Sequence, residues 1–244
     1  VFSLSAGATI NTGAESAFTT LLGYETASQV SITDQDITVD SGTISVDNAN
    51  LLDATTTGTV TASITTTERV DELKTLTAGS NAYTIVIPGD DATGSTAAEF
   101  TTINAATSVA IDASAVTGLA SDTVSNIKTL LTAGNDTNQF TANSFSSLAT
   151  AVVSDTTADV TDLTGAITQA NTATGAATTV FTITAVDTIN GGPMSEFSTL
   201  LGFEGASPSQ VSITDQNLTV DSGTASVDNA NLLDDTTTGT VTAN

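Results

Sequence analysis

The side chains best suited to chemistry in this sequence are carboxylates, and several of them fall into two groups. One group lies near the start of the chain and the other near its end: Asp34, Asp36, Asp40 and Asp47, and Asp215, Asp221 and Asp228. Carboxylate oxygens and turn carbonyls are the hard ligands that Ca²⁺ takes. These positions are therefore candidate calcium ligands, although their spacing does not reproduce an EF-hand loop.

The same acids have a second interpretation, as solvated surface residues and turn caps. In an extended segment Asp34 and Asp36 would share one face, as expected for a side that faces solvent. Asp90 and Asp91 follow Pro88 and form a further candidate loop, for which a plain turn is the alternative. The sequence leaves both explanations of the acidity open.

The sequence lacks the residues that most other catalytic and metal-binding chemistries need. The chain has no cysteine and no histidine, which removes thiol nucleophiles, histidine bases and nearly all zinc or haem ligation. Aromatic residues make up 4% of the chain and tryptophan is absent, so paired acids flanked by sugar-stacking rings are not expected. Lys74 and Lys128 fall in amphipathic segments, where a solvated position is expected. We therefore expect no enzyme activity.

The charge balance bears on which classes of partner the chain can bind. Acidic residues number 27 against three basic ones, Arg69, Lys74 and Lys128, and the formal net charge is −24. Such a surface repels nucleic-acid phosphates and anionic lipids. No apolar run approaches the ~20 residues that span a bilayer, so neither nucleic-acid binding nor membrane insertion is expected.

The acids belong to an internal repeat. Residues Gln29–Ala62 match Gln210–Ala243 at all but four of 34 positions, and the match continues upstream to Phe18 and Phe197. The repeated segments are thus Phe18–Ala62 and Phe197–Ala243, with a period of about 180 residues and shorter repeats over 63–196. Self-similarity at a fixed period is the signature of an array, so we expect residues 1–244 to form one continuous repeat array.

Within this period, short helices alternate with β-rich runs. Thr65-x-x-Glu68 and Thr96-x-x-Glu99 match capping boxes, while Ala78-Gly79 and Ala133-Gly134 match helix ends. The predicted strands are Val30–Val39, Val60–Ile64, Tyr83–Ile87, Val109–Val116, Phe140–Phe145, Val160–Ile167, Val180–Ile189 and Val211–Val220. This spacing predicts an α/β solenoid, a stack of parallel strands with short helices. The alternative is an all-β adhesin-type sandwich in which TTTG and VDSG are hairpin turns.

Three consecutive segments carry a resemblance to a known type of repeat: VDNANLLDATTTGTVTASI, ERVDELKTLTAGSNAYTIVI and AAEFTTINAATSVAIDASAV. They resemble the Thr/Ala/Asp-rich tandem repeats of giant bacterial cell-surface and haemolysin-like proteins, of the marine cyanobacterial type, which are also seen in phage structural proteins. The resemblance implies extracellular display, assembly or adhesion, and it carries no catalytic residues. The glycine-rich nonapeptide of calcium-binding toxin repeats is not among these motifs.

These observations favour a structural repeat segment of an extracellular surface protein that self-assembles into a layer, filament or stalk. Its partners would then be copies of itself. The alternative is an adhesin or phage fibre module that binds a surface glycan or protein. For that alternative, Gly191–Met194 is the candidate binding loop, because it interrupts the period.

Overall fold

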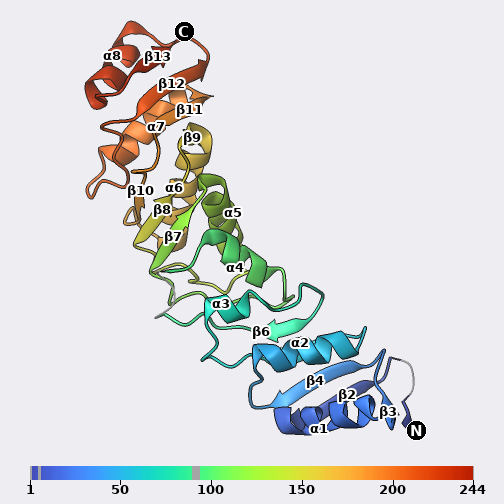
Figure 1. The fold of residues 1–244 in the computed structure, drawn as a ribbon. Helices are drawn as coiled ribbons and strands as arrows, with labels where there is room; N and C mark the ends of the chain where they lie inside the picture. Colours follow the sequence, from blue (N-terminus) through green and yellow to red (C-terminus); the bar gives the residue numbers. More distant parts are fainter. Residues whose placement is uncertain (1, 5–6, 90–93, 244) are drawn as a thin grey trace. The chain divides into compact units, whose positions relative to one another are not determined.

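The structure, a computed structural model, describes residues 2–4, 7–89 and 94–243 (Figure 1). Helices alternate with short strands, and every pairing between the described strands is parallel. The predicted α/β class is confirmed, and the all-β alternative is wrong. The chain divides into two compact units, one of Val1–Asp91, Glu99–Ala113 and Thr137–Thr141, the other of Ala92–Ala98, Ser114–Asp136 and Ala142–Asn244.

The first unit contains a parallel sheet whose strands follow the chain. Its elements are β1 (Phe2–Ser3), β2 (Thr9–Ala14), α1 (Glu15–Thr26), β3 (Val30–Ser31), β4 (Asp36–Ser41), α2 (Val46–Thr55), β5 (Val60–Ser63), α3 (Val70–Leu73) and β6 (Ala82–Thr84). The sheet order is β2-β4-β5-β6, and β1 pairs with β3. Isolated bridges from Val86 to Asp112 and from Ile111 to Phe140 continue the parallel pairing.

The second unit repeats this arrangement. Its elements are β7 (Gly118–Asp122), α5 (Val124–Gly134), β8 (Thr150–Val153), β9 (Thr157–Asp159), α6 (Val160–Thr174), β10 (Val180–Thr182), β11 (Thr188–Pro193), α7 (Met194–Glu204), β12 (Asn217–Ser222), α8 (Val227–Thr236) and β13 (Val241–Ala243). The sheet orders are β7-β8-β10 and β9-β11-β12-β13, again in chain order. Helix α5 packs against α6 and α6 against α7. The remaining helix, α4 (Ala97–Asn104), contributes residues to both units.

The two repeated segments fold alike. Thr9 pairs with Asp36 between β2 and β4, and their counterparts Thr188 and Asn217 pair between β11 and β12, with the register shift at the same place. The bridge between Phe181 and Val211 likewise repeats the β1–β3 pairing. The repeat therefore begins well before Phe18. Residues 1–62 are called the first copy below, and residues 180–243 the second copy.

Short polar side chains start the helices. Ser45 caps α2 by accepting the N–H of Asn48 at 3.3 Å, and Ser226 caps α8 in the same way. A serine oxygen at this position satisfies one of the N–H groups that have no partner within the helix. Thr123 caps α5 by the same contact with the N–H of Asn126.

Three predicted strands are wrong. The segment Val109–Val116 forms only isolated bridges, at Ile111 and Asp112. The segment Val160–Ile167 is the start of α6, because Asp159 accepts two N–H groups of its first turn and Gly175, at φ 68°, ends it. The buried residues of α6 follow helical spacing, which outweighs the β-branched composition. The segment Phe140–Phe145 turns after one bridge, since Asn143 and Phe145 have positive φ.

The predicted capping boxes have different outcomes. Helix α4 begins directly after Thr96, as predicted, whereas α3 begins at Val70 rather than directly after Thr65. There Glu72 accepts the N–H of Arg69 at 2.8 Å, so the glutamate half of a capping box lies four residues further along the chain; an arginine side chain has no acceptor for the other half. The predicted helix end at Gly134 is confirmed.

The cores of both units consist of small apolar side chains with a few rings. Phe18 and its counterpart Phe197 are both buried, one in each copy. The largest fully buried side chains include Tyr83, Phe100, Phe140, Phe145, Phe181 and Phe197. Burying each ring stabilises the fold by about 1.5–3 kcal/mol.

Candidate functional site

The acid pair Asp34 and Asp36 does not converge on a shared site. Asp34 accepts a hydrogen bond from the neighbouring Gln35 amide, and its counterpart Asp215 does the same from Gln216 at 2.7 Å. Asp36 instead accepts the backbone N–H of Thr59 at 2.7 Å. The two carboxylates therefore serve local contacts with different partners.

The counterpart of Asp36 shows what this position requires. In the second copy it is Asn217, whose side-chain oxygen accepts the N–H of Thr240 at 2.8 Å. Thr240 corresponds to Thr59, so a neutral amide makes the same bond as the carboxylate. The position requires an oxygen acceptor for a backbone N–H and does not require a charge.

The other predicted calcium ligands also lie apart. Asp221 is exposed and accepts the N–H of Gly191 at 2.7 Å, and its counterpart Asp40 is exposed as well. Asp47 and Asp228 are exposed in the first turns of α2 and α8, where a negative charge favours the helix dipole.

Among residues 2–4, 7–89 and 94–243, no three acidic side chains are grouped so that they could hold a metal ion. Asp90 and Asp91 lie outside the described residues. The geometry thus gives the predicted calcium site no support. Several of the described carboxylates, including Asp36 and Asp221, instead accept N–H groups of the protein.

One contact that the sequence analysis missed recurs along the chain. In it, a carboxylate accepts an N–H group at the start of the helix that precedes it in the sequence. Glu68 accepts the N–H of Val46 at 3.1 Å, at the start of α2. Asp122 accepts that of Ala98 at 2.8 Å in α4, and Asp155 that of Val124 at 2.6 Å in α5. The separations are 22, 24 and 31 residues, so each acid ties two successive turns of chain together. These capping carboxylates are the candidate functional residues of the fold.

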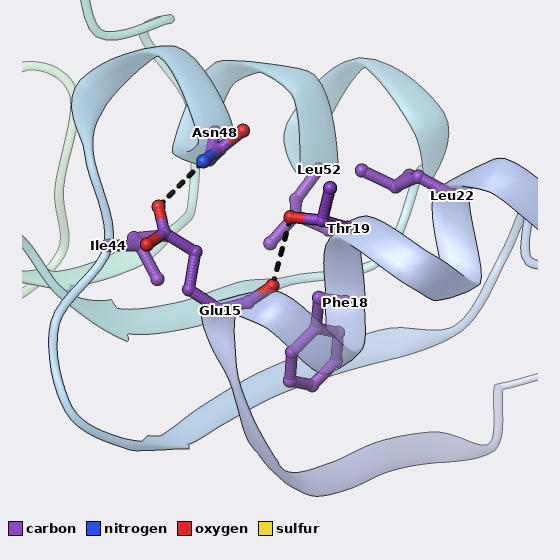
Figure 2. Close-up of a pocket in the computed structure, with 7 residues that line it drawn as sticks. All are labelled: Glu15, Phe18, Thr19, Leu22, Ile44, Asn48 and Leu52. Carbon is purple, nitrogen blue, oxygen red and sulfur yellow. Dashed lines mark hydrogen bonds between the residues drawn. The ribbon is translucent and has the colours of Figure 1, made fainter.

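Glu15 makes the reverse contact, with the start of α2, the next helix along the chain. Figure 2 shows its carboxylate directed at Asn48, whose side-chain nitrogen donates to Oε1 at 2.6 Å. The backbone N–H of Ser45 donates to the same oxygen at 3.2 Å. The Asn48 bond, followed by the Ser45 bond, lowers the pKa of Glu15 below its usual value. The counterpart in the second copy is Met194, so α8 lacks this cap.

The crevice around Glu15 has no room for a ligand. It lies between α1 and α2 and is lined by Phe18, Thr19, Leu22, Ile44, Asn48 and Leu52 together with Glu15. No space for a water molecule remains in it. Glu15 thus joins two helices and does not line a binding pocket.

Two further ionisable groups have shifted pKa values without forming a reactive pair. Burial raises the pKa of Glu68, and the Val46 N–H partly offsets this shift. Burial also raises the pKa of Tyr83, whose hydroxyl donates to the carbonyl oxygen of Ala49 at 3.4 Å. Both groups face helix α2, where they contact backbone and serve a structural role.

Each basic residue has an acidic neighbour. Lys74 lies 2.6 Å from Glu99, Lys128 lies 2.8 Å from Asp162, and Arg69 lies 3.9 Å from Asp71. The hydrogen bond from Lys74 to Glu99 raises the pKa of this lysine. A lysine nucleophile needs a lowered pKa, so this arrangement is the opposite of an activated one.

Amide side chains also link successive turns of chain. Asn171 and Gln210 exchange two hydrogen bonds, of 3.1 and 2.6 Å, and Asn135 donates to the Gln169 side chain at 2.7 Å. Asn50 donates to the carbonyl of Thr75 and accepts the N–H of Thr77, both at 2.9 Å. The recurrence of Asn and Gln 34 to 39 residues apart was the sequence signal for the paired amides.

No helix among the described residues combines the length and apolar character needed to cross a membrane.

Comparisons with known proteins add no further constraint. The chain matches no protein-family model, no curated protein sequence and no solved structure. The function must therefore be inferred from the contacts described above.

Proposed function

We propose that this chain is a non-enzymatic structural repeat segment of an extracellular surface protein, which self-assembles into a filament, layer or stalk. Its strand-plus-helix turns, called rungs below, would stack as an α/β solenoid within each unit. The observation that carries the proposal is the order of the sheets, in which neighbouring strands follow the chain. Repeat proteins that stack rung on rung have this order, because each repeat contacts its neighbours.

The contacts between rungs support a mechanical role. Carboxylates such as Glu68 and Asp155, and amides such as Asn171, form hydrogen bonds with the neighbouring rung. Polar groups used in this way hold a stack in register. The resemblance to surface-protein repeats favours an extracellular location.

The adhesin alternative has no specific support. Its candidate binding loop, Gly191–Met194, forms the end of β11 and the first residue of α7. Gly192 is buried and Gly191 donates to Asp221, so this segment belongs to the packed repeat. Glycan binding remains a prediction from the resemblance.

The experiment combines sedimentation velocity with negative-stain electron microscopy over a wide range of protein and salt concentrations. We expect concentration-dependent particles of constant width and variable length, with or without a calcium chelator. Because like charges on the copies repel one another, added salt should favour assembly. Monomers under all these conditions would rule out self-assembly.

A further inference from the structure

The segment Gly191–Met194, which the sequence analysis singled out, is preceded by an asparagine. Asn190–Gly191 is the one asparagine–glycine pair in the sequence. An asparagine amide is thermally labile, and a following glycine has no side chain to hinder attack by its backbone nitrogen on the amide carbon. The first copy has Asn11 followed by Thr12 at this place, so the two copies differ in this chemistry.

The fold of the second copy favours a glycine at position 191. Gly191 has φ 87°, in the left-handed region that suits glycine. A Cβ added there would collide with Oδ2 of Asp159, whose Oδ1 is fixed by the N–H groups of Thr161 and Asp162 at the start of α6. The labile pair is therefore a consequence of how closely β9 and β11 approach each other.

Two carboxylates flank the pair, one from each neighbouring strand. Asn190 pairs in register with Asp159 of β9, and on the other side Asp221 of β12 accepts the N–H of Gly191 at 2.7 Å. Asn190 and Asp159 are half-buried, whereas Gly191 and Asp221 are exposed, so water reaches the pair. The pair thus lies inside a sheet, with an acid from a strand of this chain on each side.

We infer that Asn190 is a site of spontaneous deamidation, and that Asp221 slows the reaction by holding the N–H of Gly191. In this reaction the Gly191 nitrogen loses its proton and bonds to the side-chain carbon of Asn190. The carbon–nitrogen bond of the amide then breaks, and ammonia leaves with that proton. Water opens the resulting succinimide at one of its two carbonyls, which leaves aspartate or isoaspartate at position 190. Water is the sole co-reactant, and the reaction is independent of the proposed self-assembly.

The folded geometry opposes this reaction in two ways. The Gly191 nitrogen must turn towards the Asn190 side chain to close a five-membered ring, whereas pairing to β9 and β12 on either side holds the backbone of β11 in place. The attacking nitrogen must also give up its bond to Asp221, a charge-assisted bond of the stronger kind. Deamidation should therefore proceed through local opening of β11, and its rate should follow the population of the opened state.

The product of the reaction would weaken the sheet. It adds a negative charge at the position that pairs with Asp159, and like charges directly opposite each other destabilise a sheet. The new carboxylate would also lie next to Gly191, whose N–H is bound to Asp221, so three negative charges would lie around one turn of backbone. A chain that has reacted should therefore have a less stable second copy.

The test follows deamidation by peptide mapping and mass spectrometry during incubation in mildly alkaline buffer. Cleavage after aromatic residues gives matched peptides that end at Phe18 and Phe197, of which the first contains Asn11 and the second Asn190. In the unchanged chain, Asn190 should react at least about tenfold more slowly when folded than in urea. Asn11, which threonine follows, should hardly react in either state. No reaction at Asn190 in urea would show that the site is wrong, and equal rates in both states would show that the fold does not protect it.

Two variants test the role of Asp221. Asp221→Ala removes the acceptor and should speed deamidation of the folded chain about three- to tenfold, while Asp221→Asn keeps an acceptor oxygen and should stay within about twofold of the unchanged chain. Because Asp221 is exposed, the fold should survive both changes, which circular dichroism checks. In urea all three chains should react alike. Equal rates in the three folded chains, or a slower reaction in Asp221→Ala, would overturn the protective role.

A further measurement concerns the product. Asn190→Asp should melt about 1–4 °C below the neutral variant Asn190→Ser at neutral pH, because of the repulsion from Asp159. The difference should disappear in acid, where the carboxylates are protonated. Equal melting temperatures of the two variants at neutral pH would refute the predicted repulsion.

Discussion

Changing Asp36 to asparagine removes a negative charge but keeps the oxygen that accepts the Thr59 N–H at 2.7 Å. Changing it to alanine removes the oxygen as well and leaves a half-buried N–H without its acceptor. Loss of such a partner destabilises a fold by about 1–2 kcal/mol. The melting temperature of Asp36→Ala should therefore fall by about 2–8 °C, at about 2–4 °C per kcal/mol for a chain of this size. Asp36→Asn should lie within about 0.5 kcal/mol of the unchanged chain, because Asn217 already makes this bond.

The assay is thermal unfolding followed by circular dichroism, with a chelator and with millimolar calcium, together with hydrogen exchange at the Thr59 amide. Protection of that amide should be lost in Asp36→Ala and kept in Asp36→Asn. Asn217→Ala is the matched control, since it should expose the Thr240 amide in the second copy. The reasoning would be refuted by an asparagine variant as unstable as the alanine variant, with calcium protecting only the unchanged chain. Calcium at a hundred times its dissociation constant would stabilise a binding protein by about 2.7 kcal/mol, which this assay detects readily.

Three further predictions concern titration and packing. Hydrogen bonds from the first residues of α2 lower the pKa of Glu15, so its carboxylate stabilises the fold above the usual value of 4.5 and loses this effect as pH falls through the lowered pKa. The stability difference between the unchanged chain and Glu15→Gln, from urea unfolding, should therefore shrink towards acid pH, and a constant difference would contradict this. Burial raises the pKa of Glu68. Above that raised pKa the ionised carboxylate lowers the stability of the fold, and below the usual value of 4.5 this effect is absent. Glu68→Gln should be at least as stable as the unchanged chain at neutral pH and lose any advantage in acid, whereas a large loss at neutral pH would refute the reasoning. In thermal unfolding, Gly58→Ala should lower stability by about 1–3 kcal/mol, because its Cβ would lie 2.4 Å from a backbone carbonyl oxygen. The open helical sites Gly23→Ala and Gly202→Ala should each gain up to about 1 kcal/mol.

The sequence predicts the class of this fold because local signals and periodicity agree over most of it. Strands near Val60 and Val180 lie where β-branched runs are bounded by turns, and α4 begins directly after Thr96. The prediction fails over Val160–Ile167, where β-branched residues also fit helical spacing. There the cap at Asp159 and the stop at Gly175, both visible in the sequence, were the signals that decide between the two periods.

The candidate site was less predictable, because its partners are distant along the chain. The acid that caps α2 lies 22 residues beyond the first residue of that helix, and the acid that caps α5 lies 31 residues beyond. Because the loops between rungs differ in length, these acids do not recur at a fixed spacing in the sequence. The exchange of Asp36 for Asn217 between near-identical copies was nevertheless readable, since it indicates a position that needs a side-chain oxygen but no charge.

The acidity of this chain and its repeat then have a common explanation. In a stack of rungs, a helix start presents N–H groups that need an acceptor, and for α2, α4 and α5 an acid on the following rung supplies one. These acids account for part of the net charge of −24, which keeps the sides of different chains apart.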